Sequence, residues 1–337
     1  MPHAAVVILS WNGRKFLEEF LPKVLATTQD AEIIVADNAS NDDTIAWMKN
    51  NFPAIRLIAM EKNRGFAGGY NAALKNLDHD YFILLNQDVA PSFGWVNTLI
   101  DVLEKNKTVA AVQPKILSLK NKTQFEYAGA AGGMMDKFGF PFCRGRIFTN
   151  CENDNGQFET EEKIHWASGA CMAVRADVFK ALGGFDERLF AHMEEIDLCW
   201  RMMNAGYEIR YTPFSSIYHL GGGSLPQGNP RKVFLNFRNN LLILHKNLPD
   251  GKVWNILCRR GFFDKVAAWK FFFGGKFSSG AAVYRAWFRF LFTKGKNAVR
   301  KSARMNLKHE AWNDFYPHSI VWKFFFAGKK RWSDLKK

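Results

Sequence analysis

Short β-rich runs alternate with stretches of helical periodicity over residues 1–115, and no other feature restricts the fold of this 337-residue chain as strongly. The β-rich runs are residues 4–10, 32–38, 55–60, 81–85 and 109–113. The helical stretches between them are residues 13–28, 42–51, 68–76 and 92–105. A strand followed by a helix, repeated four times, predicts an α/β fold with a parallel sheet and helices on both of its faces.

Polar residues follow four of these runs, at positions 10–12, 37–40, 61–64 and 86–88. Ligands of such sheets bind beyond the carboxyl ends of the strands, so we expect these four clusters to open onto one edge. Asp88 comes just after the fourth run, in FILLNQDVAP. An aspartate often does no more than start a turn, but at this edge it can also hold a charged ligand.

The second cluster begins with Asp37 and leads into a helix through DNASNDD. Asn41 or Asp42 as a helix N-cap accounts for part of the cluster. It does not account for Asp37, which ends the strand before the turn. A carboxylate there is placed to accept hydrogen bonds from a ribose or a base edge.

A glycine-rich segment, GFAGGYN, starts at Gly65 after the third run. A helix that begins with glycines lets backbone N–H groups approach a phosphate, although such glycines often serve close packing of helix on sheet. The spacing is not G-x-G-x-x-G, and the segment does not follow the first run. A dinucleotide-binding oxidoreductase is therefore disfavoured.

Three acids, Glu194, Glu195 and Asp197, lie at the start of a helix predicted in AHMEEIDLCWR. Asp197 and Arg201 are four residues apart and are predicted to pair with each other. Glu194 and Glu195 point about 100° apart, so only one of them faces a given ligand. The helix dipole favours an acid in the first turn and is expected to keep it ionised, as a general base must be.

A histidine, His219, is followed closely by three glycines in YHLGGGS. A lone histidine is more often structural than a ligand. The glycines nevertheless predict a loop that closes over a ligand. Between the two regions, residues 117–164 are rich in glycine and turn residues and predict an irregular insertion with hairpins.

Positive charge is concentrated in the C-terminal third. Residues 1–229 hold 22 Lys and Arg against 27 Asp and Glu, whereas residues 230–337 hold 24 against 5. The second segment also carries 15 of the 31 Phe and 6 of the 11 Trp. This composition predicts a basic, aromatic helical region that binds an anionic membrane surface. An ordinary helical subdomain that packs its aromatic residues on the core explains it equally well.

The five cysteines are odd in number and form no C-x-x-C pair, which argues against a disulfide framework or a zinc site. No stretch of roughly 18 apolar residues occurs, and no basic leader precedes the first run. We expect a cytoplasmic protein, placed peripherally on the inner face of the cytoplasmic membrane if the basic region binds lipid.

Six segments, taken in order, resemble glycosyltransferase family 2 of the GT-A fold, especially its rhamnosyltransferase-like bacterial branch. They are VVILSWNG, IIVADNASNDDT, NRGFAGGYNAAL, FILLNQDVAP, ASGACMAVRADVFKALGGFDERLFAHMEEIDLCWRMMNAGY and YHLGGGS. The resemblance implies a Rossmann-like nucleotide-sugar-binding catalytic domain over residues 1–229, followed by the helical region 230–337. It implies inverting transfer of a sugar from a dTDP- or UDP-linked donor to an acceptor hydroxyl. A lipid-linked saccharide of bacterial surface polysaccharide synthesis is the expected acceptor.

The resemblance also implies roles for individual residues. Those on the nucleotide-sugar side are Ser10, Asn12, Asp37, Asn38, Arg64, Gly65, Gly69 and Asn86, and those on the acceptor side are Trp166, Ser168 and Gly169. Asp88 would bind a divalent cation, Mg²⁺ or Mn²⁺, on the diphosphate, and His219 would complete the metal shell and favour Mn²⁺. Glu195 would accept the acceptor proton, with Glu194 as the competing base.

Two positions depart from the family pattern that the resemblance implies. Asn86 stands where the DxD element has its first acid, and Glu195 stands where the "ED" pair usually has Asp. Two other classes of protein are disfavoured. A nucleotidyltransferase would have a glycine-rich, basic loop directly after the first strand. A non-catalytic basic protein that binds membrane or nucleic acid would not carry its polar clusters in the acidic half, and no nucleic-acid motif is present.

Overall fold

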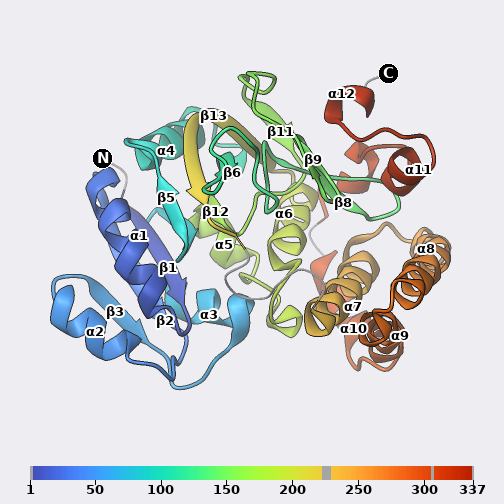
Figure 1. Cartoon of the computed structure of the whole chain (residues 1–337), viewed down its shortest axis with the longest axis horizontal. Coiled ribbons are helices and arrows are strands. Elements are labelled where there is room, and N and C mark those ends of the chain that lie inside the picture. The colour runs from blue at the N-terminus through green and yellow to red at the C-terminus, as the bar shows by residue number, and fades with distance from the viewer. Residues whose placement is uncertain (1–2, 222–228, 305–306, 336–337) are drawn as a thin grey trace.

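The computed structural model describes residues 3–221, 229–304 and 307–335, and its centre is a nine-stranded sheet (Figure 1). The strand order is β11-β13-β6-β12-β4-β1-β2-β3, and β5 pairs with β13. These strands are β1 Ala4–Ser10, β2 Ala31–Asp37, β3 Arg56–Ala59, β4 Tyr81–Asn86, β5 Val89–Pro91, β6 Val109–Ser118, β11 Glu162–Ile164, β12 Cys171–Arg175 and β13 Glu208–His219.

Strands β1 to β4 pair with one another in parallel. β1 lies between β2 and β4, and β2 also pairs with β3. β12 then runs antiparallel to both β4 and β6, and β13 runs parallel to β6. The predicted α/β fold with a mostly parallel central sheet is confirmed.

Alternate residues of β1 enter two separate hydrophobic cores, one on each face of the sheet. Val6 belongs to the core that packs against α1 (Arg14–Thr27) and α4 (Trp95–Lys105). Val7 belongs to the core that packs against α3 (Gly65–Leu74) and α6 (Glu194–Asn204). Because side chains alternate along a strand, a continuous apolar run is what a strand buried on both faces requires.

β6 is longer than the sequence predicts and continues through Pro114. The predicted run ends at Gln113, and the next residue is Pro114, which has no N–H to donate to the ladder. In the structure β6 continues to Ser118, and its register with β13 shifts between Thr212 and Ser216. This bulge in the partner strand accommodates the proline inside the sheet.

The irregular insertion forms a second, four-stranded antiparallel sheet in the order β10-β9-β8-β7. Its strands are β7 Gly133–Met135, β8 Pro141–Cys143, β9 Arg146–Ile147 and β10 Asn150–Cys151. The predicted hairpins are confirmed. The short strand β11, at the end of the insertion, pairs with β13 and forms one edge of the main sheet.

The basic C-terminal region is helical, and Figure 1 shows α7 to α10 grouped at one end of the molecule. Its helices are α7 Pro230–Asn247, α8 Val253–Phe273, α9 Phe277–Leu291, α10 Lys296–Ala303, α11 Ile320–Phe325 and α12 Trp332–Leu335. The other helices are α2 Thr44–Asn51 and α5 Ala176–Ala181, with 3-10 turns η1 Glu187–Leu189 and η2 Ala311–Asp314. Leu241, Leu244 and Ile256 belong to the same core as the sheet.

A buried charge cluster joins this region to α6. Asp197 accepts hydrogen bonds from Arg201, Lys246 and Asn247, each at 2.9 Å. The predicted pairing of Asp197 with Arg201 is confirmed. The division into a catalytic domain 1–229 and a region 230–337 stays a prediction, because the two segments share this cluster and one core.

Candidate active site

Strand register brings the ends of three parallel strands together. Ser10, the last residue of β1, lies opposite Asp37, and its neighbour Leu9 lies opposite Asn86 of β4. Ser10 and Asp37 are fully buried, and Asn86 is half-buried. The carboxyl edge of the sheet therefore carries a serine, an acid and an amide side by side.

Hydrogen bonds hold the loops after β1 and β2 against each other. The Asn12 N–H donates to Ser40 Oγ at 2.8 Å, and the Asn41 N–H donates to Asn12 Oδ1 at 2.7 Å. Both oxygens of Asp37 accept hydrogen bonds from Ser40. Since each carboxylate oxygen has a second lone pair, Asp37 keeps acceptor capacity for a ribose hydroxyl.

Asn38 uses its side chain to fix the next loop. Its Nδ2 donates to the Gly65 carbonyl at 2.9 Å, and its Oδ1 accepts from the Arg64 N–H at 2.9 Å. Arg64 itself is exposed. In this conformation Asn38 positions the segment that carries Arg64.

Gly65 and Gly69 serve close packing. Gly65 has φ +70°, and a Cβ built on it would lie 2.3 Å from the Phe190 carbonyl oxygen. A Cβ on Gly69 would lie 2.9 Å from Leu9 Cδ1. The Ala67 N–H, in the first turn of α3, donates to the Phe190 carbonyl at 3.2 Å, so this amide is engaged within the protein.

Asp88, His219 and Glu126 form a buried row at the same edge. Val89 pairs with His219 across β5 and β13, which places His219 next to Asp88. His219 Nε2 lies 3.1 Å from Asp88 Oδ1, and His219 Nδ1 lies 3.1 Å from Glu126 Oε2. Asn86 Nδ2 lies 3.4 Å from the same Nε2. Glu126 was not predicted as a site residue, because it lies in the irregular insertion outside every motif.

The two carboxylates determine the charge of His219. Burial alone would lower its pKa, but hydrogen bonds and charge from Asp88 and Glu126 outweigh burial and raise the pKa to about 10. The imidazole therefore carries a proton at neutral pH when no cation is bound. A cation that takes Nε2 must displace this proton, so binding of the cation is coupled to pH.

The donor set fits a divalent cation of the Mg²⁺ or Mn²⁺ type. Two ligand atoms that share an octahedral ion at about 2.1 Å lie about 3 Å apart, close to the observed separation of Asp88 Oδ1 and His219 Nε2. Glu126 Oε2 lies 3.1 Å from Nδ1, so Nε2 is the ring nitrogen on the side of Asp88 that would bind the cation. A carboxylate behind a metal-binding histidine is a frequent way to fix its tautomer.

Glu194 and Glu195 begin α6 with one carboxylate oxygen each that lacks a hydrogen-bond partner among the described residues. Burial and repulsion from Glu195 raise the pKa of Glu194 well above its ordinary value. Burial raises the pKa of Glu195 to about 7. Burial therefore opposes the helix dipole, which was predicted to keep an acid in this turn ionised. Glu195 is the less buried of the two and titrates near neutrality.

The acceptor-side residues differ in how their polar atoms are used. Trp166 is buried, and its Nε1 donates to the Met134 carbonyl at 2.9 Å. Ser168 is buried as well, and its hydroxyl donates to the Ala128 carbonyl. Gly169 lies against Phe66 and next to Ala170, whose carbonyl accepts the Asn86 N–H at 3.0 Å. Ser168 also contacts Ala170, because its hydroxyl oxygen accepts the Ala170 N–H at 3.1 Å, so both Ser168 and Gly169 lie next to the edge that carries Asn86.

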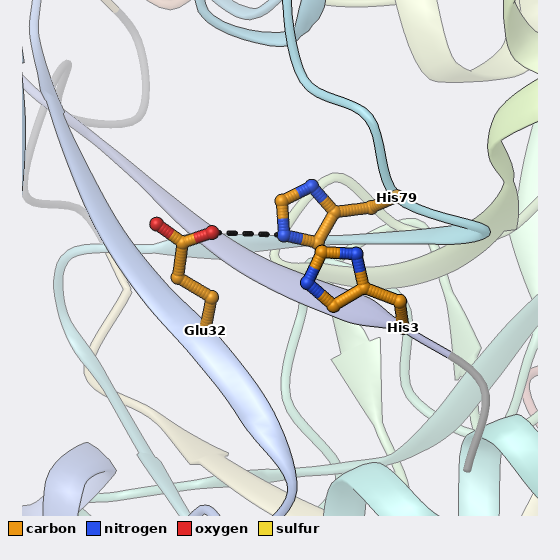
Figure 2. A group of neighbouring side chains, drawn as sticks. All are labelled: His3, Glu32 and His79. Atoms are coloured by element: carbon orange, nitrogen blue, oxygen red, sulfur yellow. Dashed lines mark ion pairs between the residues drawn. The ribbon is translucent and has the colours of Figure 1, made fainter.

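A further histidine cluster lies at the opposite, amino-terminal edge of the sheet (Figure 2). His79 Nε2 lies 2.9 Å from Glu32 Oε2, and the rings of His3 and His79 stack with centroids 3.8 Å apart at 14°. Imidazole nitrogens bind a metal ion in the plane of the ring, and two nearly parallel rings cannot both contain one ion in their planes. This stack therefore lacks the geometry of a metal site.

One predicted feature cannot be placed. The glycine-rich loop after His219, which we expected to close over a ligand, falls largely on residues 222–228, outside the described residues. His219 and Gly221 at its start are described, and Gly221 has φ +69°.

Solved structures share this architecture and place the chain in the GT-A fold class. GalNAc-T7 with UDP, GalNAc and Mn²⁺ superposes with a TM-score of 0.58 at 17% identity, over 73% of this chain and 49% of that chain. The mannosyltransferase PcManGT from Pyrobaculum calidifontis, in complex with GDP-Man and Mn²⁺, gives 0.53 at 15% identity, over 93% and 82%. At these identities the likeness shows the fold alone.

The chain belongs to glycosyl transferase family 2, whose family description matches residues 5–183, more than half of its length. It is 29% identical over 233 residues to the N-acetylglucosaminyl-diphospho-decaprenol L-rhamnosyltransferase of Mycobacterium tuberculosis, covering 64% of this chain and 75% of that protein. It is 24% identical over 221 residues to rhamnosyltransferase WbbL of Escherichia coli strain K12, covering 64% and 82%. The resemblance to this family and its rhamnosyltransferase-like branch is confirmed.

Proposed function

We propose that the chain transfers a rhamnosyl or related hexosyl group, with inversion, from a dTDP- or UDP-linked donor to a hydroxyl of a lipid-linked saccharide. The observation that carries this proposal is the row of Asp88, His219 and Glu126 beside Asn86, at the edge where Asp37 keeps acceptor capacity. A diphosphate leaving group and a nucleoside require this pairing of a cation site with a polar strand edge.

Asp88 and His219 would hold a divalent cation, and Glu126 would orient His219. When bound, the cation neutralises charge on the departing nucleoside diphosphate. The side chains contribute the rest. Asp37 would accept hydrogen bonds from the ribose, and Asn86 would present its amide to the donor diphosphate. Arg64, exposed on the segment that Asn38 fixes, would add positive charge on the donor side.

Glu195 would act as the general base on the acceptor hydroxyl. A pKa of about 7 balances the two needs of such a base, which must be deprotonated at neutral pH and still bind a proton. Glu194, whose pKa burial and repulsion from Glu195 raise well above its ordinary value, is the weaker candidate. Deprotonation of the hydroxyl opposite the leaving group is what inversion requires.

The acceptor is proposed from the relatives. The printed name of the mycobacterial relative gives its acceptor as N-acetylglucosaminyl-diphospho-decaprenol. A polyprenyl diphosphate is anchored in a membrane, so an enzyme that uses one works at the membrane surface. We propose the inner face of the cytoplasmic membrane, where nucleotide sugars are made. Among the described residues, no helix is both long and apolar enough to cross a bilayer.

A calorimetric titration of the full chain with nucleotide sugars tests the proposal. dTDP-rhamnose, UDP-glucose, UDP-galactose and UDP-N-acetylglucosamine are each titrated with Mn²⁺, with Mg²⁺ and with chelator. We expect saturable binding of one donor that depends on the cation and is lost in Asp88→Ala. Absence of binding by every donor in both metals would contradict the proposed function. Product analysis with a short-chain N-acetylglucosaminyl-diphospho-prenol then tests the acceptor.

A further inference from the structure

Large apolar side chains are exposed mainly on the C-terminal helices. Of the 17 exposed large apolar residues among the described residues, 13 lie between residues 254 and 326. Soluble monomers rarely expose contiguous apolar patches of this kind unless the patch binds something. The concentration in one region of the chain indicates a surface with a function, separate from the catalytic edge.

The exposed residues of α8 form a single stripe. Phe262, Val266, Trp269 and Phe273 are exposed and follow one another at spacings of four, three and four residues, which keeps them on one side of the helix. Phe273 is 85% exposed and Trp269 is 54% exposed. More than half of each of these two side chains is therefore exposed, so they are not packed into a hydrophobic core.

The neighbouring helix α9 carries a matching stripe of Phe277, Tyr284, Phe288 and Leu291, at spacings of seven, four and three residues. Ring contacts join the two stripes. Trp269 contacts Phe272 at 6.0 Å between centroids, and Phe272 stacks with Tyr284 at 6.3 Å. We call the two stripes together the aromatic face.

Basic residues flank the aromatic face and acids are absent from it. Lys265 and Lys270 are exposed on α8, and Arg285 and Arg289 are exposed on α9. Asp264 is the one acid in the described residues 253–304. It is buried and bound to Arg260 Nε and Trp287 Nε1, each at 2.9 Å. The surface therefore combines apolar rings with uncompensated positive charge.

We infer that the aromatic face docks the protein on an anionic lipid bilayer, with α8 and α9 lying in the interface and not crossing it. Exposed Phe and Trp rings with Lys and Arg beside them are what an interfacial helix needs, because the rings enter the acyl boundary while the cations meet lipid phosphates. A second copy of the chain is a poorer occupant, because two such faces would oppose like charges. This inference does not depend on the catalytic assignment.

Co-sedimentation of the full chain with vesicles tests the inference. One vesicle is phosphatidylcholine alone, and the other is phosphatidylcholine mixed with phosphatidylglycerol. We expect the protein to bind the anionic vesicle, with binding that weakens as salt rises. The variant Trp269→Ser with Phe273→Ser should lower the partition coefficient roughly tenfold or more. Lys265→Glu with Lys270→Glu should lower the partition coefficient on the anionic vesicle and not on the neutral one.

The matched control is Phe93→Ser with Phe214→Ser, which removes two equally exposed rings from the catalytic half, at 70% and 69% exposure. It should bind vesicles like the parent chain. Calorimetric donor binding, measured on the same samples, should be unchanged in all three variants and shows that they are folded. The inference is overturned if the Trp269 variant binds vesicles normally. It is also overturned if gel filtration shows that the face mediates a dimer. Binding of RNA as tight as binding of anionic vesicles of the same charge density would overturn it as well.

Discussion

Asp88 and His219 are 131 residues apart in the sequence, yet Asp88 Oδ1 and His219 Nε2 lie 3.1 Å apart in the buried edge of the sheet. The pairing of β5 with β13 produces this contact, since it sets Val89 directly opposite His219. Taken alone, neither residue shows whether it serves a turn or binds a ligand. Together, with Glu126 behind the histidine, they make up the cation site that we propose.

Replacing Asp88 by Asn should remove the cation site while preserving side-chain volume. We expect turnover to fall by roughly 10²- to 10³-fold, because charge on the leaving diphosphate is no longer neutralised. Cation-dependent donor binding, measured by calorimetry, should fall as well. Asn86→Asp is the matched control and should keep turnover, since it adds an acid beside the site. Normal turnover in Asp88→Asn would remove the metal assignment.

Glu195 should determine both the pH profile and part of the stability. As a base it must lose its proton, so turnover should rise with pH through about 7 and then level off. Its pKa in the folded chain lies above the ordinary value of 4.5, so the folded state favours the protonated form. The folded state therefore becomes less stable, relative to the unfolded state, as the pH rises from 4.5 through about 7.

Glu195→Gln should consequently inactivate the enzyme and stabilise it above pH 7. We expect a gain of up to about 3 kcal/mol at pH 8 and none below pH 4.5, measured by urea unfolding. Glu194→Gln is the comparison. If that variant loses turnover and Glu195→Gln does not, the two roles are reversed.

Lys246 should be needed for stability although it lies outside the catalytic edge. Its ammonium group lies 2.9 Å from Asp197 and 3.0 Å from Asp186, and both acids are buried or nearly so. Lys246→Met leaves this negative charge short of a partner and should cost about 3 kcal/mol. Lys265→Met, on the exposed side of α8, should change stability little.

Because α7 shares the hydrophobic core of the main sheet, unfolding of the chain should show a single transition, and two separated transitions would contradict this shared core.

Gly65 should tolerate no side chain. Gly65→Ala combines a positive φ with a Cβ 2.3 Å from the Phe190 carbonyl oxygen, so we expect a loss of roughly 2 to 4 kcal/mol. Gly183→Ala separates the two effects, because Gly183 has φ +77° and nothing within 4 Å of its Cβ position. It should lose about 1 kcal/mol. Equal losses in thermal unfolding would show that the contact with Phe190 does not matter.

The strand and helix pattern was predictable because β1, β2 and β4 are buried on both faces and read as continuous apolar runs. Strand β5 was not predictable. It has three residues, and only its pairing with β13 makes it a strand. Pro114 also misled the prediction of β6, since a bulge in a distant strand absorbs it.

The candidate site was predictable where its residues follow strands and not where they depend on tertiary contacts. Asp37 and Asn86 end strands, so the alternation alone locates them. Glu126 has no local signal, and only its contact with His219 Nδ1 gives it a role. The raised pKa of Glu194 and Glu195 was likewise hidden, because burial of the α6 start depends on the whole fold.

The shared core of α6 and α7 restricts how this chain can be recombined with its relatives. A crossover near residue 229 would separate Asp197 from Lys246 and Asn247, so a chimera inherits a mismatched set of buried charges. Exposed positions such as Phe273 carry no such constraint. New surface affinities can therefore arise by point substitution on α8 and α9, whereas exchange of the entire tail requires compensating changes in the catalytic half.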